Sequence, residues 1–479
     1  MKEIGQKAPM ILIIVIVAAI VAGAIGYALK PAEVAPGQTV TVTVPGPTVT
    51  VTVPGPTVTV PVEIEPRRAY EGTTLRLLLK TGYETAAIEQ FKDVFEDATG
   101  INIEYEIYDE PTMRSKFILD ATTEAGTYDV ASVQYWYFAE YDKNDWLEPL
   151  DDYIATKADP WLDFEAIQEG VREMYIGGDG KTYALPTSLA GGMLNYRTDI
   201  FEEHGIKVPE TTDEVLAAAD EITALGIPGL YAIGGRGDPT FASFGSTAGW
   251  AWAYGARVLD PETYHPTVDT PEMLQAMTDY VHLLKDHGSP GQAGIGWAEI
   301  SEMYRAGSVA MHFDMSGFPS VYINPEISTV ADRTSTTLIK GPAGNYAQWL
   351  YSEGLGIPKY SKNKEAAWLF IQWRVSLDTY KREVRAHIRF DIPIESIYGL
   401  SLYREEAEKI GAGPLTEALP KCFATINSAY WPWIPEFVEV AEAFQSEISS
   451  AIAGEKSVAD ALTSAQSAID AIMRGAGYY

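Results

Sequence analysis

The chain has 479 residues, which is too long for one ordinary domain and predicts two or three. With 46% hydrophobic and 21% charged residues its composition is globular, so disorder of the whole chain is excluded. The net charge is −31, from 66 Asp and Glu against 35 Lys and Arg, and a surface that acidic repels phosphate backbones, so nucleic acid is not an expected partner.

The first segment, 1–30, contains an uncharged apolar run over 8–29 that is long enough to span a bilayer as one helix. Lys2 and Lys7 precede the run, and these early charges favour a cytoplasmic start. We expect a retained signal anchor in the cell membrane, with the rest of the chain outside the cell. A cleaved signal sequence, or cleavage just before the apolar run as in archaeal prepilin-like signals, are the alternatives.

A low-complexity segment follows over 31–69. The sequence TVTVTVPGP occurs at 39–47 and again at 48–56, and TVTVP comes next. Alternating Thr and Val are typical of a strand, but a Pro-Gly-Pro in each repeat is expected to break any ladder. Thr-rich segments punctuated by proline favour an extended stalk that is open to O-glycosylation. Such a stalk would hold the following body away from the membrane.

The body of the chain, from about residue 70, opens with alternating strand and helix patterns. Strands are expected over 74–79, 101–107 and 128–133, and helices over 85–98 and 112–124. This alternation predicts α/β layers with parallel strands, and ligands of such sheets bind beyond the carboxyl ends of the strands. Residues 81–84 and 134–136 are therefore a candidate site.

Later elements are signalled by caps and glycines. A capping box beginning at Thr211 predicts a helix that runs to about residue 224. Ser457 begins a striped helix that Gly475 is expected to end. The sequence GGDG at 177–180 is typical of a hairpin turn.

Motifs that would indicate catalysis or metal binding are absent from the sequence. The GKT at 180–182 mimics the end of a phosphate-binding loop, but Tyr175 stands where that loop needs a glycine. His282 and His287 are five residues apart, which does not suit one helical face, and Cys422 is the only cysteine. We therefore expect no catalytic residue, no metal ligand and no cofactor. A carboxylate pair of a glycan hydrolase is an alternative that the sequence alone does not test.

Aromatic residues are more informative, with 11 Trp and 28 Tyr. Several gather at expected strand ends or loops, in clusters at 135–137, 250–254, 349–351 and 430–433. Flat rings that pack on the apolar faces of sugars, beside carboxylates and amides that bind hydroxyls, are typical of carbohydrate sites. A lone Trp is more often a core residue, and we assign Trp368 and Trp373, within an expected amphipathic helix, to the core.

The body resembles the extracellular solute-binding proteins of ABC importers, in the branch that binds sugars. The segments that carry the resemblance are 128–154, 179–221, 304–316, 354–373 and 432–473. The apolar run with its Thr-rich stalk resembles archaeal, membrane-tethered members. The loop 187–192 lacks the acidic residue that members binding maltodextrins often carry, which argues against a maltodextrin as the ligand.

The resemblance implies a two-lobed, periplasmic-binding-protein-like α/β fold with a hinge and an interlobe cleft. Lobe one would comprise 70–188 and 345–390, and lobe two 189–344 and 391–479. The crossing segments are expected near 186–191, 341–351 and 390–393. The lobes would close on the solute and then dock on the ABC permease subunits and their ATPase, with no covalent chemistry.

Loop position and side-chain chemistry then single out the residues expected to contact the solute. They are Tyr83, Glu84, Gln134, Tyr135, Trp136, Ser188, Trp250, Trp252, Asp314, Ser316, Trp349, Glu353 and Trp431. We place Trp250 and Trp252 at the start of a helix, and Asp314 just after a strand. The solute is expected to be a mono- or oligosaccharide. A peptide, polyol or polyamine, or a surface protein without a transport role, are the alternatives.

Overall fold

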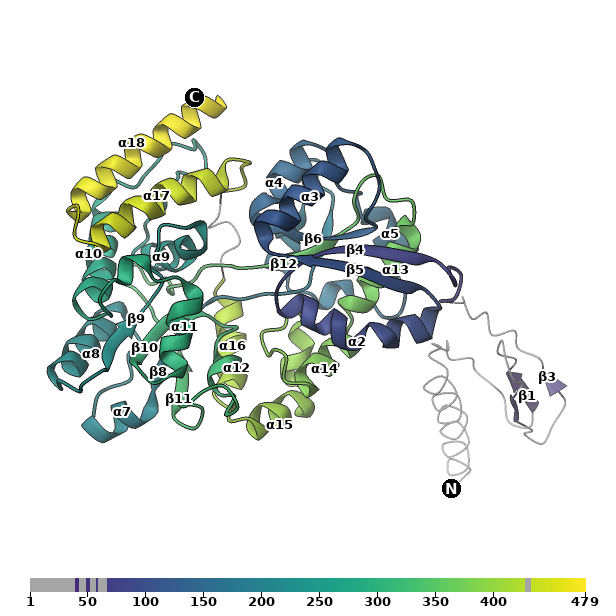
Figure 1. Ribbon diagram of the computed structural model, residues 1–479. Coiled ribbons are helices and arrows are strands. Elements are labelled where there is room, and N and C mark those ends of the chain that lie inside the picture. Colours follow the sequence, from purple (N-terminus) through teal and green to yellow (C-terminus); the bar gives the residue numbers. More distant parts are fainter. Residues whose placement is uncertain (1–38, 43–48, 52–56, 59–66, 427–431) are drawn as a thin grey trace, which may run out of the picture. The chain divides into compact units, whose positions relative to one another are not determined.

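The computed structural model describes residues 39–42, 49–51, 57–58, 67–426 and 432–479 (Figure 1). The apolar run at 8–29, where we expect a membrane helix, lies outside the described residues. Within the described ranges, no helix combines the length and the hydropathy needed to cross a membrane. Of the described residues, those up to Leu75 form one compact unit with Phe91–Glu104, and Arg76–Gln90 forms the other with those from Tyr105 onward.

In the first unit, the Thr-Val runs pair with one another. Strand β1 (Thr39–Val42) is antiparallel to β2 (Val49–Val51) and parallel to β3 (Thr57–Val58). The expectation that the repeats form no ladder is therefore wrong for these runs. The Pro-Gly-Pro triplets fall between the paired runs in the sequence, so they remove no backbone donor from a strand.

Five strands form the first sheet of the body, in the order β5-β4-β6-β12-β7. Their bounds are β4 Thr74–Lys80, β5 Asn102–Tyr108, β6 Val130–Gln134, β7 Ala184–Pro186 and β12 Glu353–Gly356. The three predicted strands are confirmed as β4, β5 and β6. Parallel pairing holds for β4 with β6, but β12 runs antiparallel to both of its neighbours, β6 and β7.

Helices accompany this sheet. They are α2 (Tyr83–Thr99), α3 (Glu110–Thr122), α4 (Tyr135–Lys143), α5 (Asp151–Thr156), α6 (Glu169–Arg172), α13 (Lys364–Arg374) and α14 (Leu377–Arg385), with the 3-10 turns η1 (Phe164–Ala166) and η2 (Glu173–Tyr175). The helices predicted over 85–98 and 112–124 are confirmed as α2 and α3. Trp368 and Trp373 are buried in α13, as expected of core residues. The turn at 177–180 is also confirmed, because Gly180 N donates to Gly177 O at 2.9 Å.

The second sheet has the order β11-β8-β10-β9. Its strands are β8 (Gly192–Arg197), β9 (Tyr231–Gly234), β10 (Val309–Met315) and β11 (Thr334–Thr337). Its helices are α7 (Thr198–His204), α8 (Thr212–Ala224), α9 (Phe241–Ala253), α10 (Pro271–Asp286), α11 (Trp297–Arg305) and α12 (Pro319–Tyr322), with η3 at Gln292–Gly294. The predicted cap is confirmed, since Thr211 Oγ1 accepts a hydrogen bond from Glu214 N at 3.3 Å.

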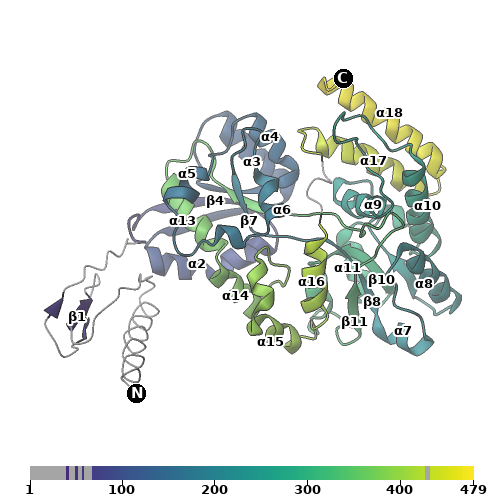
Figure 2. The same ribbon diagram turned by 180° about the vertical axis from the view of Figure 1, so that it is seen from behind.

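The last helices are η4 (Glu395–Gly399), α15 (Ser401–Lys409), α16 (Leu415–Ala424), α17 (Phe437–Ile452) and α18 (Val458–Ala476). Helices α17 and α18 lie side by side and pack near α9 and α10 (Figures 1 and 2). Ser457 caps α18 as predicted. The helix ends at Gly477 rather than Gly475, because Gly477 takes the left-handed conformation at φ +84°.

Two segments connect the sheets, one from β7 to β8 and one from β11 to β12. They pair with each other, since Ala190 N donates to Tyr351 O and Tyr351 N donates to Ala190 O, both at 2.9 Å. Near the third expected crossing, Gln168 N donates to Pro393 O at 3.0 Å. The paired segments 187–191 and 338–352 thus form a two-stranded connection between the sheets.

Candidate functional site

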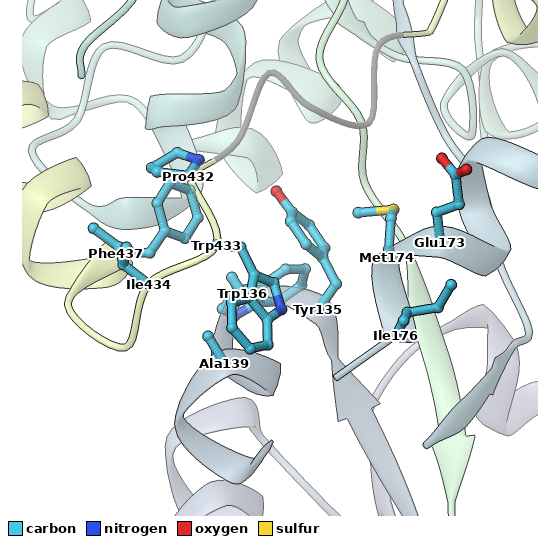
Figure 3. Close-up of a pocket in the computed structure, with 10 residues that line it drawn as sticks. All are labelled: Tyr135, Trp136, Ala139, Glu173, Met174, Ile176, Pro432, Trp433, Ile434 and Phe437. Carbon is cyan, nitrogen blue, oxygen red and sulfur yellow. The ribbon is translucent and has the colours of Figure 1, made fainter. Parts of the chain in front are cut away.

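A cavity of about 370 Å³ lies beyond the carboxyl end of β6, where the first turn of α4 faces the segment that leads into α17 (Figure 3). Aromatic and aliphatic side chains make up most of its wall, and Glu173 is the one carboxylate among the described lining residues. The lining residues are Tyr135, Trp136, Ala139, Glu173, Met174, Ile176, Pro432, Trp433, Ile434 and Phe437. Such a wall suits a solute that has both apolar faces and polar edges.

Trp136 is held by hydrogen bonding and by ring contacts on several sides. Its indole Nε1 donates to Glu110 Oε1 at 3.0 Å, and its ring lies 5.3 Å from that of Tyr351 and 5.5 Å from that of Phe241. Tyr135 packs edge-on against it at 5.4 Å. Two predicted site residues therefore stand together, in fixed orientations, at the cavity.

Gln134, the last residue of β6, is completely buried. Neither its amide nitrogen nor its amide oxygen has a hydrogen-bond partner among the described residues. An unpaired buried amide costs free energy, on the order of 1–3 kcal/mol. Gln134 immediately precedes the two cavity residues in the chain, but its own side chain is not part of the cavity wall.

Glu353, the cross-strand neighbour of Gln134, belongs to a network of charged side chains. Glu353 is directly opposite Gln134 in the sheet and forms an ion pair with Lys80, the last residue of β4. Lys80 Nζ also donates to the Tyr351 hydroxyl at 3.0 Å and lies 3.9 Å from Glu110 Oε2. The network links the ends of β4 and β12 to the Trp136 indole through Glu110.

Burial and the neighbouring Glu110 carboxylate raise the pKa of Tyr137 well above its usual value. This tyrosine therefore stays a neutral hydrogen-bonding group next to Trp136.

Ser188 and Ser316 hold the connection 187–191 in place. Ser188 Oγ accepts from Glu353 N at 2.9 Å. Ser316 Oγ accepts from Gly191 N at 3.2 Å, and Ser316 N donates to Gly191 O at 2.8 Å. Both hydroxyls thus serve the backbone of the connection.

Asp314 lies inside strand β10 rather than after it, because the strand continues to Met315. It is fully buried and forms a two-pronged ion pair with Arg236, whose Nε and Nη2 lie 2.9 and 2.5 Å from its two carboxylate oxygens. His312 Nε2 lies 3.1 Å from the same carboxylate. Burial alone would raise the pKa of Asp314, but Arg236 and His312 outweigh it and hold this pKa well below its usual range.

The tryptophans expected on lobe two pack as structural side chains. Trp250 and Trp252 lie in the last turn of α9 and not at a helix start, because the helix already begins at Phe241. Trp250 is completely buried against Tyr254, Tyr280 and Phe313, and its Nε1 has no hydrogen-bond partner in the described part of the chain. Trp252 stacks on the Arg257 guanidinium at 4.7 Å.

Trp349 occupies a space left by three glycines. A Cβ added to Gly192, Gly245 or Gly249 would come within 2.8 Å of its ring. The indole also meets Phe313 edge-on at 5.4 Å. Trp349 therefore joins the crossing segment to the packing of β8 and α9.

The remaining predicted residues are not placed. Tyr83 and Glu84 are the first two residues of α2, but their side chains, like the whole of Trp431, lie outside what the structure describes. The predictions did not include Trp433, although its aromatic cluster is visible in the sequence, or Phe437. No sequence signal marks Glu173, Met174 and Ile176, which line the cavity from η2 and the residue after it.

Comparison with known proteins identifies the fold and the family. A family model described as "Bacterial extracellular solute-binding protein" matches residues 81–376. The mannitol-binding protein of Pseudomonas aeruginosa is 26% identical over 433 residues, covering 86% of this chain and 96% of its own length. The erythritol/L-threitol-binding protein of Mycolicibacterium smegmatis is 22% identical over 365 residues, covering 72% of this chain and 75% of its own.

Solved structures of solute-binding proteins have the same fold as this chain. An ABC transporter solute-binding protein from Agrobacterium vitis with bound D-mannitol superposes with a TM-score of 0.72 at 29% identity, over 85% of this chain and 99% of that one. A protein from Agrobacterium radiobacter in complex with ribitol gives a TM-score of 0.74 at 23% identity, over 84% and 99%. The expected two-lobed α/β fold of periplasmic binding proteins is confirmed. The chain belongs to the family of bacterial extracellular solute-binding proteins, the non-enzymatic substrate-binding components of ABC transporters.

Proposed function

We propose that this chain captures a small sugar or sugar alcohol outside the cell and delivers it to the permease of an ABC importer. The observation that carries the proposal is the cavity walled by Tyr135, Trp136, Trp433 and Phe437. Flat rings pack on the C–H faces of a polyhydroxylated chain or ring, and the Glu173 carboxylate in the same wall can accept hydrogen bonds from hydroxyls.

Cavity size and charge favour a small, neutral solute. A volume of about 370 Å³ falls at the low end of the range of roughly 300–1,000 Å³ for small-molecule sites. None of the ten described lining residues is Lys, Arg or His. Lys80 is paired with Glu353, so it does not provide an uncompensated positive charge. The relatives named for mannitol and for erythritol or threitol support the same substrate class.

The proposed mechanism is closure of two lobes. Residues 70–188 with 345–390 form lobe one, and 189–344 with 391–479 form lobe two, a division supported by the strands that each sheet contains. The paired connections 187–191 and 338–352 act as the hinge. A solute bound to both lobes stabilises the closed form, which is the form that docks on the permease.

The test is calorimetry with D-mannitol, ribitol, erythritol, D-glucose and maltose, together with a dipeptide and a polyamine. One sugar or polyol is expected to bind without turnover, and to raise the unfolding free energy by about 2.7 kcal/mol at 100 times its dissociation constant. Trp136→Ala is expected to abolish this binding, while Trp297→Ala, at an exposed tryptophan outside the cavity, leaves it unchanged.

Two results would contradict the proposal. Binding of only the dipeptide or the polyamine would keep a solute-binding role and remove the carbohydrate assignment. Unchanged sugar affinity in Trp136→Ala would move the site away from this cavity.

We further propose that the apolar run at 8–29 anchors the chain in the membrane and that 31–69 acts as a spacer. The length of the run without a charge supports an anchor. Expressed in full, the chain is expected in the membrane fraction after an alkaline wash, and a chain lacking 1–30 in the soluble fraction. Equal solubility of the two chains would refute the anchor.

A further inference from the structure

Two histidines and an aspartate converge on the side of the second sheet, at residues that take no part in the cavity. His282 lies near the end of α10, His287 directly follows that helix, and Asp220 lies on α8. His287 Nε2 is 3.4 Å from His282 Nε2 and 3.3 Å from Asp220 Oδ1. One potential ligand atom from each of the three residues lies within 4.8 Å of the others.

These separations match the ligand spacing around a tetrahedral metal ion. Atoms bonded at about 2.0–2.1 Å to one zinc ion, at tetrahedral angles, stand about 3.4 Å apart. Two of the three separations have this value. The third separation, between the Asp220 carboxylate and His282, can shorten by rotation of the Asp220 side chain, which is 69% exposed.

Outer hydrogen bonds orient both imidazoles. His282 Nδ1 lies 2.7 Å from Asp286 Oδ2, and since a carboxylate can only accept, this nitrogen carries the proton and leaves the Nε2 lone pair toward His287. His287 Nδ1 lies 2.8 Å from the Thr223 hydroxyl. Metal-bound histidines have such partners on their second nitrogen.

The fold also explains why a five-residue spacing brings the two rings together. At φ −119° and ψ −10°, His287 leaves the helical path. Its carbonyl accepts a hydrogen bond from Ala232 N at 3.1 Å, which fixes it against β9.

We propose that Asp220, His282 and His287 bind one divalent ion of the zinc type, with the fourth coordination position open to water. Imidazole ligands select zinc, cobalt, nickel or copper over magnesium and calcium. The ion would join α8 to the end of α10 and to β9. It would act as a clamp within lobe two, separate from the solute site.

The experiment is a Zn²⁺ titration of the full chain after treatment with a chelator, in competition with a chromophoric indicator. One equivalent of Zn²⁺ is expected to bind, and excess Mg²⁺ should not displace it. Co²⁺ in its place is expected to give the intense visible absorption of tetrahedral coordination. Weak absorption typical of six-coordinate Co²⁺, or no binding above the indicator's background, would overturn the proposal.

Variants at the exposed members keep the test independent of folding. His282→Gln and Asp220→Asn should each weaken Zn²⁺ binding by more than the roughly 10–100-fold expected for the outer partner in Asp286→Asn. His204→Gln, at an exposed histidine on α7, is the matched control and should bind as the unchanged chain does. Equal affinity in His282→Gln and His204→Gln would overturn the site. Solute affinity should stay the same in all four variants, so this outcome is distinguishable from failure of the proposed function.

Discussion

Replacing Asp314 by Asn should destabilise the protein strongly, because it leaves a buried guanidinium without its counter-charge. The Arg236 side chain is 6% exposed and that of Asp314 is fully buried. Removing one partner of a buried ion pair costs about 3–5 kcal/mol. Asn retains one acceptor oxygen, and Arg236 retains its bond to Ala242 O at 2.6 Å, so we expect the lower end, about 3 kcal/mol.

The assay is urea unfolding of the purified chain at pH 7, with two companion variants. Arg236→Met combined with Asp314→Leu should lose less stability than Asp314→Asn alone, since an apolar pair leaves no buried charge. Asp470→Asn removes one partner of the exposed Asp470–Arg474 pair and should have little effect. A loss below about 1 kcal/mol in Asp314→Asn, the range of an exposed pair, would refute the reasoning.

The dependence on pH checks the same ion pair by another route. The folded pKa of Asp314 is well below the unfolded value of about 3.9. Its stabilisation is therefore fully present above about pH 4 and is lost as pH falls further. The difference between Asp314→Asn and the unchanged chain should stay constant from pH 8 to about 4.5 and shrink below about pH 4. A difference that already shrinks between pH 7 and 5 would contradict this.

Further predictions concern packing, capping and the thiol. Gly245→Ala should cost about 1–3 kcal/mol, because the new Cβ would lie 2.8 Å from the Trp349 ring. Gly475→Ala, at a helical glycine with open space around it, should instead stabilise by up to about 1 kcal/mol, and thermal unfolding compares the two. Ser457→Ala should cost about 1 kcal/mol through loss of the α18 cap, and an unchanged melting temperature would contradict it. Burial raises the pKa of Cys422 to about 12, so a thiol reagent should label it only after unfolding, and rapid labelling of the folded chain would count against that burial.

Local patterns predicted much of the secondary structure. Strands β4, β5 and β6 were predictable as short apolar or alternating runs, and helices α2, α8 and α18 from an apolar stripe with a cap or a stopping residue. Whether a strand runs parallel or antiparallel to its neighbours was harder to predict from the sequence. The antiparallel placement of β12 depends on a chain return from the second sheet, which no local period encodes. The start of α9 was also missed, because glycine and serine are poor helix formers, whereas in the structure Gly245 and Gly249 pack against Trp349.

The candidate site was predictable where it follows a strand end. Tyr135 and Trp136 reach the cavity because they begin the helix after β6. Asp and Trp are residue types typical of binding sites, so Asp314 and Trp250 were predicted to contact the solute. In the structure both are buried against residues that are distant in the sequence. Arg236 comes 78 positions before Asp314, and this pairing exists only in three dimensions. The five-residue spacing likewise predicted that His282 and His287 lie on different faces of a helix, whereas their Nε2 atoms are 3.4 Å apart in the structure.

The hydrogen bonds between Ala190 and Tyr351 make the two connections a single ribbon, with a mechanical and an evolutionary consequence. Neither connection can slide past the other without breaking these two hydrogen bonds. We therefore expect the lobes to rotate about one axis instead of sliding against each other. Their lengths are also interdependent. Inserting one residue into either connection would shift its pairing register with the other and turn its side chains to the opposite face. Only a bulge or a matching insertion in the other connection would absorb the change.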